Sequence, residues 1–117
     1  LHGIEPEGLN YSKMEITWPN YSLRPENIEG AYYLYQYTKD PEYLKMGTFM
    51  FNSLVKYCKN EAGFCALKSV VTKEKEDYME SFFLAETLKY AFLLFDDNQS
   101  LDFNSVIFNT EAHPYKR

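Results

Sequence analysis

The chain has 117 residues, enough for one domain, and 45% of them are hydrophobic, so a folded core is expected rather than disorder. The formal net charge of -5 argues against a nucleic-acid partner and against binding to anionic membranes, and no apolar run approaches the roughly 18 residues of a membrane span. Aromatic residues make up 18%, with 11 Tyr and 9 Phe, the side chains on which sugars and apolar ligands stack.

The first half of the chain predicts a connecting segment followed by a helical hairpin. Residues 1–22 carry Gly, Pro and Asn at short intervals without a sustained period, which indicates an extended segment. A helix is expected to begin at "RPENIE", with Pro25 at its first position. Asp40-Pro41 then ends this helix and opens a second one, in which Asp40 is the N-cap and which runs to about Tyr57.

The second half predicts a short β segment and a buried helix. "GFCALKSVVT" (63–72) alternates and is rich in β-branched residues, so a short strand or hairpin is expected there. Asp77 and Glu80 have the spacing of a capping box, and a third helix is expected from about Tyr78 to Phe95. Because this helix is apolar on nearly all sides, it should be buried.

The C-terminal segment "VIFNTEAHP" (106–114) places a hydroxyl, a carboxylate and an imidazole directly behind an apolar run. The apolar run predicts a short buried strand that carries Thr110 and Glu111 inward, where a frayed tail would otherwise be expected. His113 is interpreted as structural, since the only other histidine, His2, lies in a loop.

Three carboxylates on the helices are candidate functional groups. Glu26 and Glu29 share one helix face, while Glu86 lies in the middle of the apolar third helix. Phe82 precedes Glu86 by one turn, so an aromatic platform and an acceptor could hold a sugar together. A buried carboxylate needs a partner, a metal ion or a shifted pKa. The alternatives are that Glu26 only complements a helix N-terminus, that Glu29 is solvated and that Phe82 is a core residue.

Cysteines and glycosylation motifs favour a secretory-pathway protein. Cys58 and Cys65 are either a disulfide or two buried thiols. Three Asn-x-Ser sequons begin at Asn10, Asn20 and Asn98. The sequence contains no Gly-rich phosphate loop, Ser/His/Asp set or zinc spacing, so the residues alone predict a buried acidic cluster on a helical scaffold.

Three long motifs resemble one known family. "LRPENIE" (23–29), "MESFFLAETLKY" (79–90) and "VIFNTEAHP" (106–114) are similar, in this order, to the C-terminal signature segments of class I α1,2-mannosidases, glycoside hydrolase family 47. "GIEPEG" (3–8) also fits a family segment. The resemblance implies an all-α fold, part of an α/α toroid of helical hairpins with short β-hairpin segments. Residues 1–117 would be the C-terminal portion of a single catalytic domain whose upstream portion is absent from the chain.

The resemblance also implies an activity: calcium-dependent, inverting hydrolysis of terminal α1,2-linked mannose from high-mannose N-glycans, in the lumen of the endoplasmic reticulum or Golgi. By this resemblance Thr110 binds Ca2+ directly and Glu26 is the general base. Pocket residues that contact the sugar are Arg24, Pro25, Phe82, Glu86 and Glu111, and the carboxylates that hold calcium-bound waters are Glu26, Glu29, Glu86 and Glu111. The opposing catalytic acid would come from the upstream part of the same domain.

Two alternatives remain at this level. Residues 63–72 also resemble the ER degradation-enhancing mannosidase-like proteins, which would make the chain part of a glycan-binding quality-control factor with little hydrolysis and with a possible redox partner in the endoplasmic reticulum. The other alternative is an isolated helical fragment without a pocket, which should aggregate through its apolar third helix.

Overall fold

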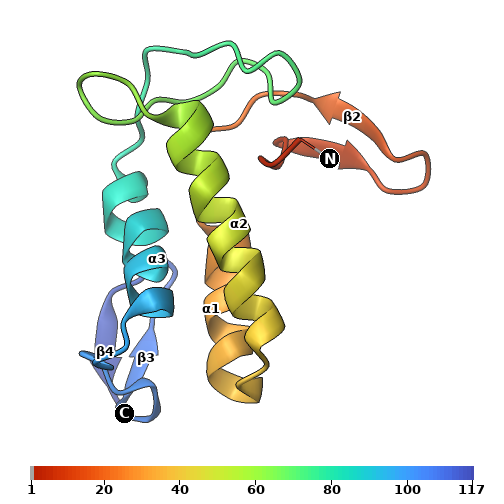
Figure 1. Ribbon diagram of the computed structural model, residues 1–117. Coiled ribbons are helices and arrows are strands. Elements are labelled where there is room, and N and C mark those ends of the chain that lie inside the picture. The colour runs from red at the N-terminus through yellow and green to blue at the C-terminus, as the bar shows by residue number, and fades with distance from the viewer. Residues whose placement is uncertain (1) are drawn as a thin grey trace. The chain divides into compact units, whose positions relative to one another are not determined.

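The computed structural model describes residues 2–117, which are mainly helical with two small antiparallel sheets (Figure 1). This confirms the predicted combination of helices and short β segments. The described residues form two compact units: unit 1 contains residues 2–23 and 49–80, and unit 2 contains residues 24–48 and 81–117. The elements in chain order are β1 (Gly8–Asn10), β2 (Glu15–Trp18), α1 (Glu26–Thr38), α2 (Pro41–Cys58), the π-helix η1 (Phe83–Thr87), α3 (Leu88–Phe95), the 3-10 helix η2 (Phe103–Ser105), β3 (Val106–Phe108) and β4 (Pro114–Lys116).

Unit 1 begins with a β-hairpin that the sequence analysis did not predict. β1 and β2 pair antiparallel, with Leu9 opposite Ile16 and a bulge after Gly8. The turn between them is closed by the Asn10 side chain, whose Oδ1 accepts a hydrogen bond from the backbone N–H of Lys13. The prediction of an extended connecting segment was wrong here because strands of three and four residues are too short to show a period.

The remainder of unit 1 is a loop region after α2. Leu67 exchanges two backbone hydrogen bonds of 2.9 Å with Tyr21, but residues 63–72 form only isolated bridges, so the strand predicted there is not formed. Cys58 and Cys65 are free thiols with 0% and 3% exposure, which selects the second of the two alternatives. Burial raises the pKa of Cys58 to about 12.

The helical hairpin of α1 and α2 forms as predicted. Asp40 Oδ1 accepts a hydrogen bond of 2.9 Å from the Glu42 N–H, which caps α2 ahead of Pro41. Lys39 adopts a left-handed conformation and its N–H bonds to the Tyr35 carbonyl, which ends α1. Pro25 occupies the N-cap of α1, one residue before the first helical position predicted for it.

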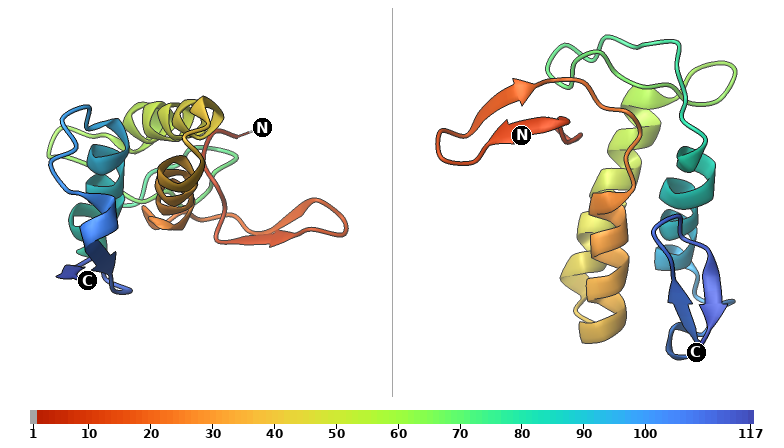
Figure 2. Two further views of the ribbon diagram at one scale, coloured as in Figure 1. Left: turned by 90° about the horizontal axis from the view of Figure 1, so that it is seen from below. Right: turned by 180° about the vertical axis from the view of Figure 1, so that it is seen from behind.

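Aromatic rings form the core of unit 2, where α1, α3 and the β3–β4 hairpin meet. Tyr32 and Tyr90 are each 1% exposed, and their ring centres lie 5.7 Å apart. Phe108, at the end of β3, lies 5.8 Å from the Tyr90 ring and completes the cluster together with Phe103 and Tyr33. The views in Figures 1 and 2 show α3 beside both α1 and the hairpin. This arrangement brings the beginnings of α1 and α3 close to the end of β3.

The third helix differs from its prediction at its start. Residues 78–81 are not helical, and five residues of π-helix, Phe83–Thr87, precede α3, which ends at Phe95 as expected. The predicted capping box does not form, since Glu80 accepts a hydrogen bond from the Tyr78 hydroxyl instead. Glu86 therefore lies in the π-helical segment, a feature that is rare and often found at functional sites.

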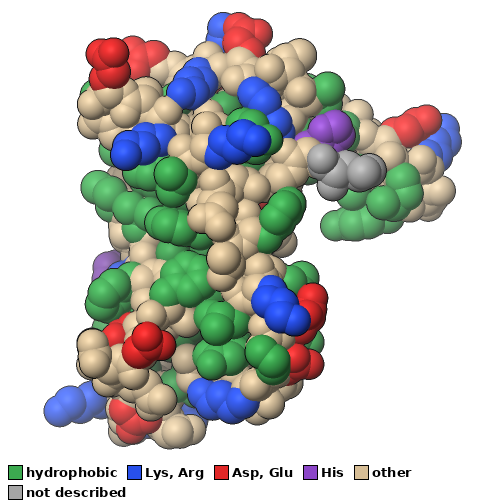
Figure 3. Space-filling model, in the orientation of Figure 1, with side chains coloured by type: hydrophobic (Ala, Val, Ile, Leu, Met, Phe, Trp, Pro, Cys, Tyr) green, Lys and Arg blue, Asp and Glu red, His purple; other side chains and the backbone are tan. Residues whose placement is uncertain are grey.

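The surface of unit 2 carries apolar side chains as well as charges. Figure 3 shows hydrophobic side chains at the surface where the start of α2 and the end of α3 lie. Met46 on α2 and Phe92 on α3 are 49% and 60% exposed. In the part of the chain that the structure describes, no helix combines the length and apolar character needed to cross a membrane.

Candidate active site

The first turn of α1 presents the residues of the "RPE" segment. Pro25 is buried, whereas Arg24 and Glu26 are exposed on either side of it. Glu29, one turn later, is half-buried and accepts a hydrogen bond of 3.0 Å from the Tyr90 hydroxyl. Glu26 and Glu29 therefore lie on one helix face, as predicted, with Glu29 anchored and Glu26 open to solvent.

Glu86 is a buried carboxylate, as the sequence predicted. Only 8% of the residue is exposed to solvent. Its pKa is raised from the ordinary value, first by burial and then by the negative charges of Glu111, Glu29 and Glu26, while Lys89 opposes the rise. Two segments, the first turn of α1 and the turn between β3 and β4, thus place carboxylates near the buried Glu86 of η1. This arrangement brings together all four carboxylates singled out in the sequence. Glu26, Glu29, Glu86 and Glu111 are called the acidic group below.

Arg24 and Phe82 form a pair at the edge of this group. The guanidinium carbon of Arg24 lies 5.5 Å from the centre of the Phe82 ring. Phe82 is half-exposed, so it is not simply a core residue, and its ring remains accessible as a platform. The planar guanidinium adds hydrogen-bond donors beside that platform.

The position of Thr110 and Glu111 corrects one prediction. Both residues are exposed and lie in the turn between β3 and β4, and are not carried inward by the strand. The physical reason is that β3 pairs with β4 in a hairpin, so the chain turns outward after Phe108. The turn is nevertheless close to the acidic group, since Glu111 acts on the pKa of Glu86.

The turn is held by two side chains that the sequence analysis missed. Asn109 Oδ1 accepts hydrogen bonds from the N–H groups of Glu111 and His113, at 3.0 and 2.9 Å. Lys89 Nζ donates a hydrogen bond of 2.7 Å to the Ala112 carbonyl. The Asx pattern of an Asn two residues before an acid could have indicated the first contact, but only the fold reveals the second.

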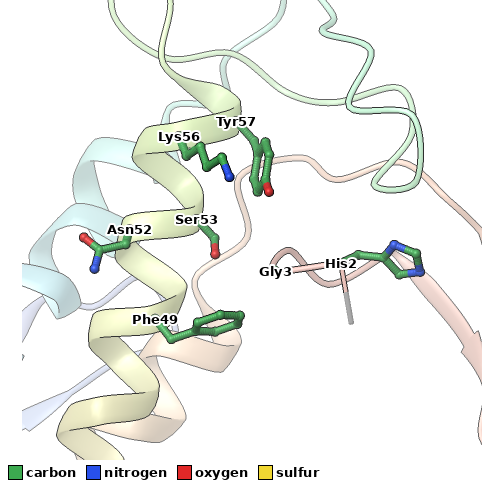
Figure 4. Close-up of a pocket in the computed structure, with 7 residues that line it drawn as sticks. All are labelled: His2, Gly3, Phe49, Asn52, Ser53, Lys56 and Tyr57. Carbon is green, nitrogen blue, oxygen red and sulfur yellow. The ribbon is translucent and has the colours of Figure 1, made fainter.

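A separate pocket of about 340 Å³ lies in unit 1. Phe49, Ser53 and Tyr57 line it from one face of α2, the face turned towards Gly3 in Figure 4. The complete lining is His2, Gly3, Phe49, Asn52, Ser53, Lys56 and Tyr57. None of the predicted site residues contributes to this pocket, so it is distinct from the acidic group in unit 2.

Comparison with known proteins identifies the family. The sequence model of glycosyl hydrolase family 47 matches residues 5–117, which is nearly the whole chain. The chain belongs to glycosyl hydrolase family 47.

Individual members of family 47 are similar over most of this chain. Alpha-mannosidase I MNS5 of Arabidopsis thaliana is 47% identical over 114 residues, which is 96% of the chain and 20% of that protein. The human ER degradation-enhancing alpha-mannosidase-like protein 3 is 43% identical over 114 residues, 96% of the chain and 12% of that protein. The solved α-1,2-mannosidase from Trichoderma reesei matches with a TM-score of 0.78 and 33% identity, over 86% of this chain and 22% of that one. The chain spans 12–20% of the length of these two curated relatives.

The group around Glu86 offers carboxylate oxygens, the kind of donor that calcium ions prefer. Among residues 2–117, no group of three or more His, Cys, Asp or Glu side chains is arranged to hold a metal ion. The donor set expected from the family 47 motifs is a different one, in which Thr110 offers a hydroxyl and a carbonyl and the carboxylates act through water. Calcium takes six to eight oxygen ligands, often including waters. A divalent cation would also favour the ionised form of Glu86, which burial and the acidic neighbours disfavour.

Proposed function

We propose that this chain supplies the C-terminal portion of a single α/α-toroid catalytic domain that removes terminal α1,2-linked mannose from high-mannose N-glycans. The reaction is calcium-dependent and inverting, and it takes place in the lumen of the endoplasmic reticulum or Golgi. The observation that carries the proposal is the convergence of Glu26, Glu29 and Glu111 on the buried Glu86. Membership of family 47 gives this group its chemical interpretation.

The sugar is bound by the Arg24–Phe82 pair and by the adjacent carboxylates. A mannose ring presents an apolar face of C–H groups, which packs on the exposed ring of Phe82. Arg24 donates hydrogen bonds to sugar hydroxyls, and the buried Pro25 fixes the backbone between Arg24 and Glu26. Glu86 and Glu111 accept hydrogen bonds from the hydroxyls on the opposite side of the ring.

Glu26 acts as the general base. It is exposed at the N-terminus of α1, so a water molecule can reach its carboxylate. Inversion requires this water to lie between the base and the anomeric carbon, with the two catalytic carboxyl groups roughly 6.5–9.5 Å apart. The catalytic acid is supplied by the upstream part of the proposed domain.

Thr110 would hold a calcium ion directly through its hydroxyl and carbonyl, and the carboxylates of Glu26, Glu29, Glu86 and Glu111 would hold it through water. When bound, the ion orients sugar hydroxyls and offsets the negative charge of the carboxylates. The exposed turn at Thr110 then faces the sugar in the assembled domain. The apolar surface around Met46 and Phe92 packs against the remainder of that domain.

The decisive experiment follows the anomer released by the complete catalytic domain that carries this chain. Proton NMR of an α1,2-linked mannobiose should show β-mannose as the first product, since inversion converts the α linkage. Glu26→Gln should lower kcat by at least about a hundredfold, within the range of general-base catalysis, and leave glycan binding largely intact. Glu42→Gln is the matched control, because Glu42 lies exposed on α2, where it pairs with Lys45. First release of α-mannose, or full turnover by Glu26→Gln, contradicts the proposed mechanism.

A second candidate is a glycan-binding quality-control factor with little hydrolysis, acting with a redox partner in the endoplasmic reticulum. The similarity to an ER degradation-enhancing mannosidase-like protein favours it. Binding of high-mannose glycan without release of mannose, in the same NMR assay, would select this candidate over the hydrolase.

A further inference from the structure

We propose that Lys89 and Tyr90, consecutive residues at the start of α3, are positioning residues that fix the distance between the two sides of the calcium-binding group. One side is the β3–β4 turn with Thr110, and the other is the first turn of α1 with Glu29. The inference rests on the proposed function, and it assigns a role to two residues that contact neither sugar nor ion.

Lys89 holds the turn. Its Nζ donates a hydrogen bond of 2.7 Å to the carbonyl of Ala112, and the contact is partly buried. Ala112 itself is fully buried and adopts a left-handed backbone conformation with φ of 54°. A charge-assisted hydrogen bond at this carbonyl restrains the residues immediately before it, which are Thr110 and Glu111.

Tyr90 holds the carboxylate on the opposite side. Its hydroxyl donates a hydrogen bond of 3.0 Å to Glu29 Oε1, while the residue is 1% exposed. The ring is packed by Tyr32 at 5.7 Å, Tyr33 at 6.1 Å and Phe108 at 5.8 Å. Since a ring packed in this way cannot swing aside, it keeps one oxygen of Glu29 in a fixed direction.

The two contacts come from neighbouring residues of one helix. Successive side chains of an α-helix point about 100° apart, so a single rigid segment reaches two different walls. Glu86 precedes Lys89 by one turn on the same continuous helical stretch. The segment from Glu86 to Tyr90 therefore sets the relative positions of three parts of the acidic group. Residues that orient metal ligands in this manner typically change metal affinity by about 10- to 100-fold when removed.

The experiment measures calcium affinity of the complete catalytic domain by titration calorimetry. Lys89→Met and Tyr90→Phe should each weaken calcium binding about tenfold, because each removes one donor and keeps most of the side-chain volume. Lys89→Arg keeps a cationic donor and should restore most of the loss. Lys116→Met and Tyr115→Phe are the controls, since both residues are exposed on β4. These two variants should bind calcium with the affinity of the wild type.

The outcomes separate the positioning role of Lys89 and Tyr90 from the proposed function. Wild-type affinity in folded Lys89→Met and Tyr90→Phe overturns the positioning role while leaving the proposed function intact. Absence of calcium binding by the wild type overturns the proposed function, and this inference with it. If Tyr90→Phe fails to fold, the comparison of Lys89→Met with Lys89→Arg decides: equal affinities of the two variants overturn the positioning role.

Discussion

The guanidinium carbon of Arg24 lies 5.5 Å above the ring of Phe82, although the two residues come from the two separate stretches of chain that make up unit 2. Arg24 immediately precedes the buried Pro25 that caps α1, and Phe82 directly precedes η1. The contact therefore joins the start of α1, which carries Glu26 and Glu29, to the start of η1, which carries Glu86. It also leaves the Phe82 ring half-exposed, as a sugar platform must be.

Phe82→Ala should weaken binding of the mannose substrate without removing the catalytic groups. Loss of an aromatic platform and of its cation–π contact is worth about 1–2 kcal/mol, which corresponds to a KM increase of roughly 5- to 30-fold. Steady-state kinetics on the complete domain would measure KM and kcat separately. Tyr115→Ala is the control, because Tyr115 is an aromatic residue that is 60% exposed on β4. A change confined to kcat would exclude the platform role.

Thr110→Ala should lower the affinity for calcium, since it removes the one side-chain oxygen expected to bind the ion directly. The expected loss is about tenfold or more, and Thr110→Ser, which keeps the hydroxyl, should retain most of the affinity. Titration calorimetry with calcium gives both values. Because Thr110 is exposed, neither substitution should affect the folding of the chain. Equal affinities for the alanine and serine variants would remove the hydroxyl from the calcium site.

Local chemistry predicted the parts of the fold that depend on single residues. Asp40-Pro41 predicted the helical hairpin because one side chain caps α2 and one ring fixes its first residue. The apolar composition around Glu86 predicted its burial, and burial predicted the direction of its pKa shift.

Features that leave no pattern in the local sequence were not predictable in the same way. The β1–β2 hairpin is stabilised by pairing between short strands, which leaves almost no periodic signal. The π-helix around Glu86 has the composition of an α-helix, so only packing distinguishes the two. The role of Lys89 could not be predicted either, because the Ala112 carbonyl that it binds lies 23 residues later in the chain.

The Cys58 thiol should be inert in the folded chain and should make stability fall in alkaline solution. Burial raises its pKa to about 12, whereas an unfolded cysteine ionises near pH 8.5. The unfolded state therefore loses its proton first as the pH rises, so stability decreases between about pH 8.5 and pH 12. In Cys65→Ser, which isolates Cys58, Ellman's reagent at pH 8 should react only after denaturant is added. Rapid reaction of the native protein would contradict the buried position.

Gly47 and Gly30 should respond in opposite directions to substitution by alanine. Both lie inside helices, where alanine is favoured over glycine by about 1 kcal/mol. A Cβ on Gly47 of α2 would overlap Leu94 Cδ2 of α3, and Leu94 is itself only 4% exposed, so it has no free space into which to move. Overpacking of this kind costs about 1–3 kcal/mol, so Gly47→Ala should lower the free energy of unfolding despite the gain in helix propensity.

Gly30 on α1 provides the matched comparison, since a Cβ there meets no atom within 4 Å. Gly30→Ala should therefore raise the free energy of unfolding by up to about 1 kcal/mol, because only the propensity gain remains. Urea denaturation of the two variants and the wild type measures the difference. If both alanines stabilise the protein equally, α2 and α3 do not approach each other at Gly47 as closely as the structure places them.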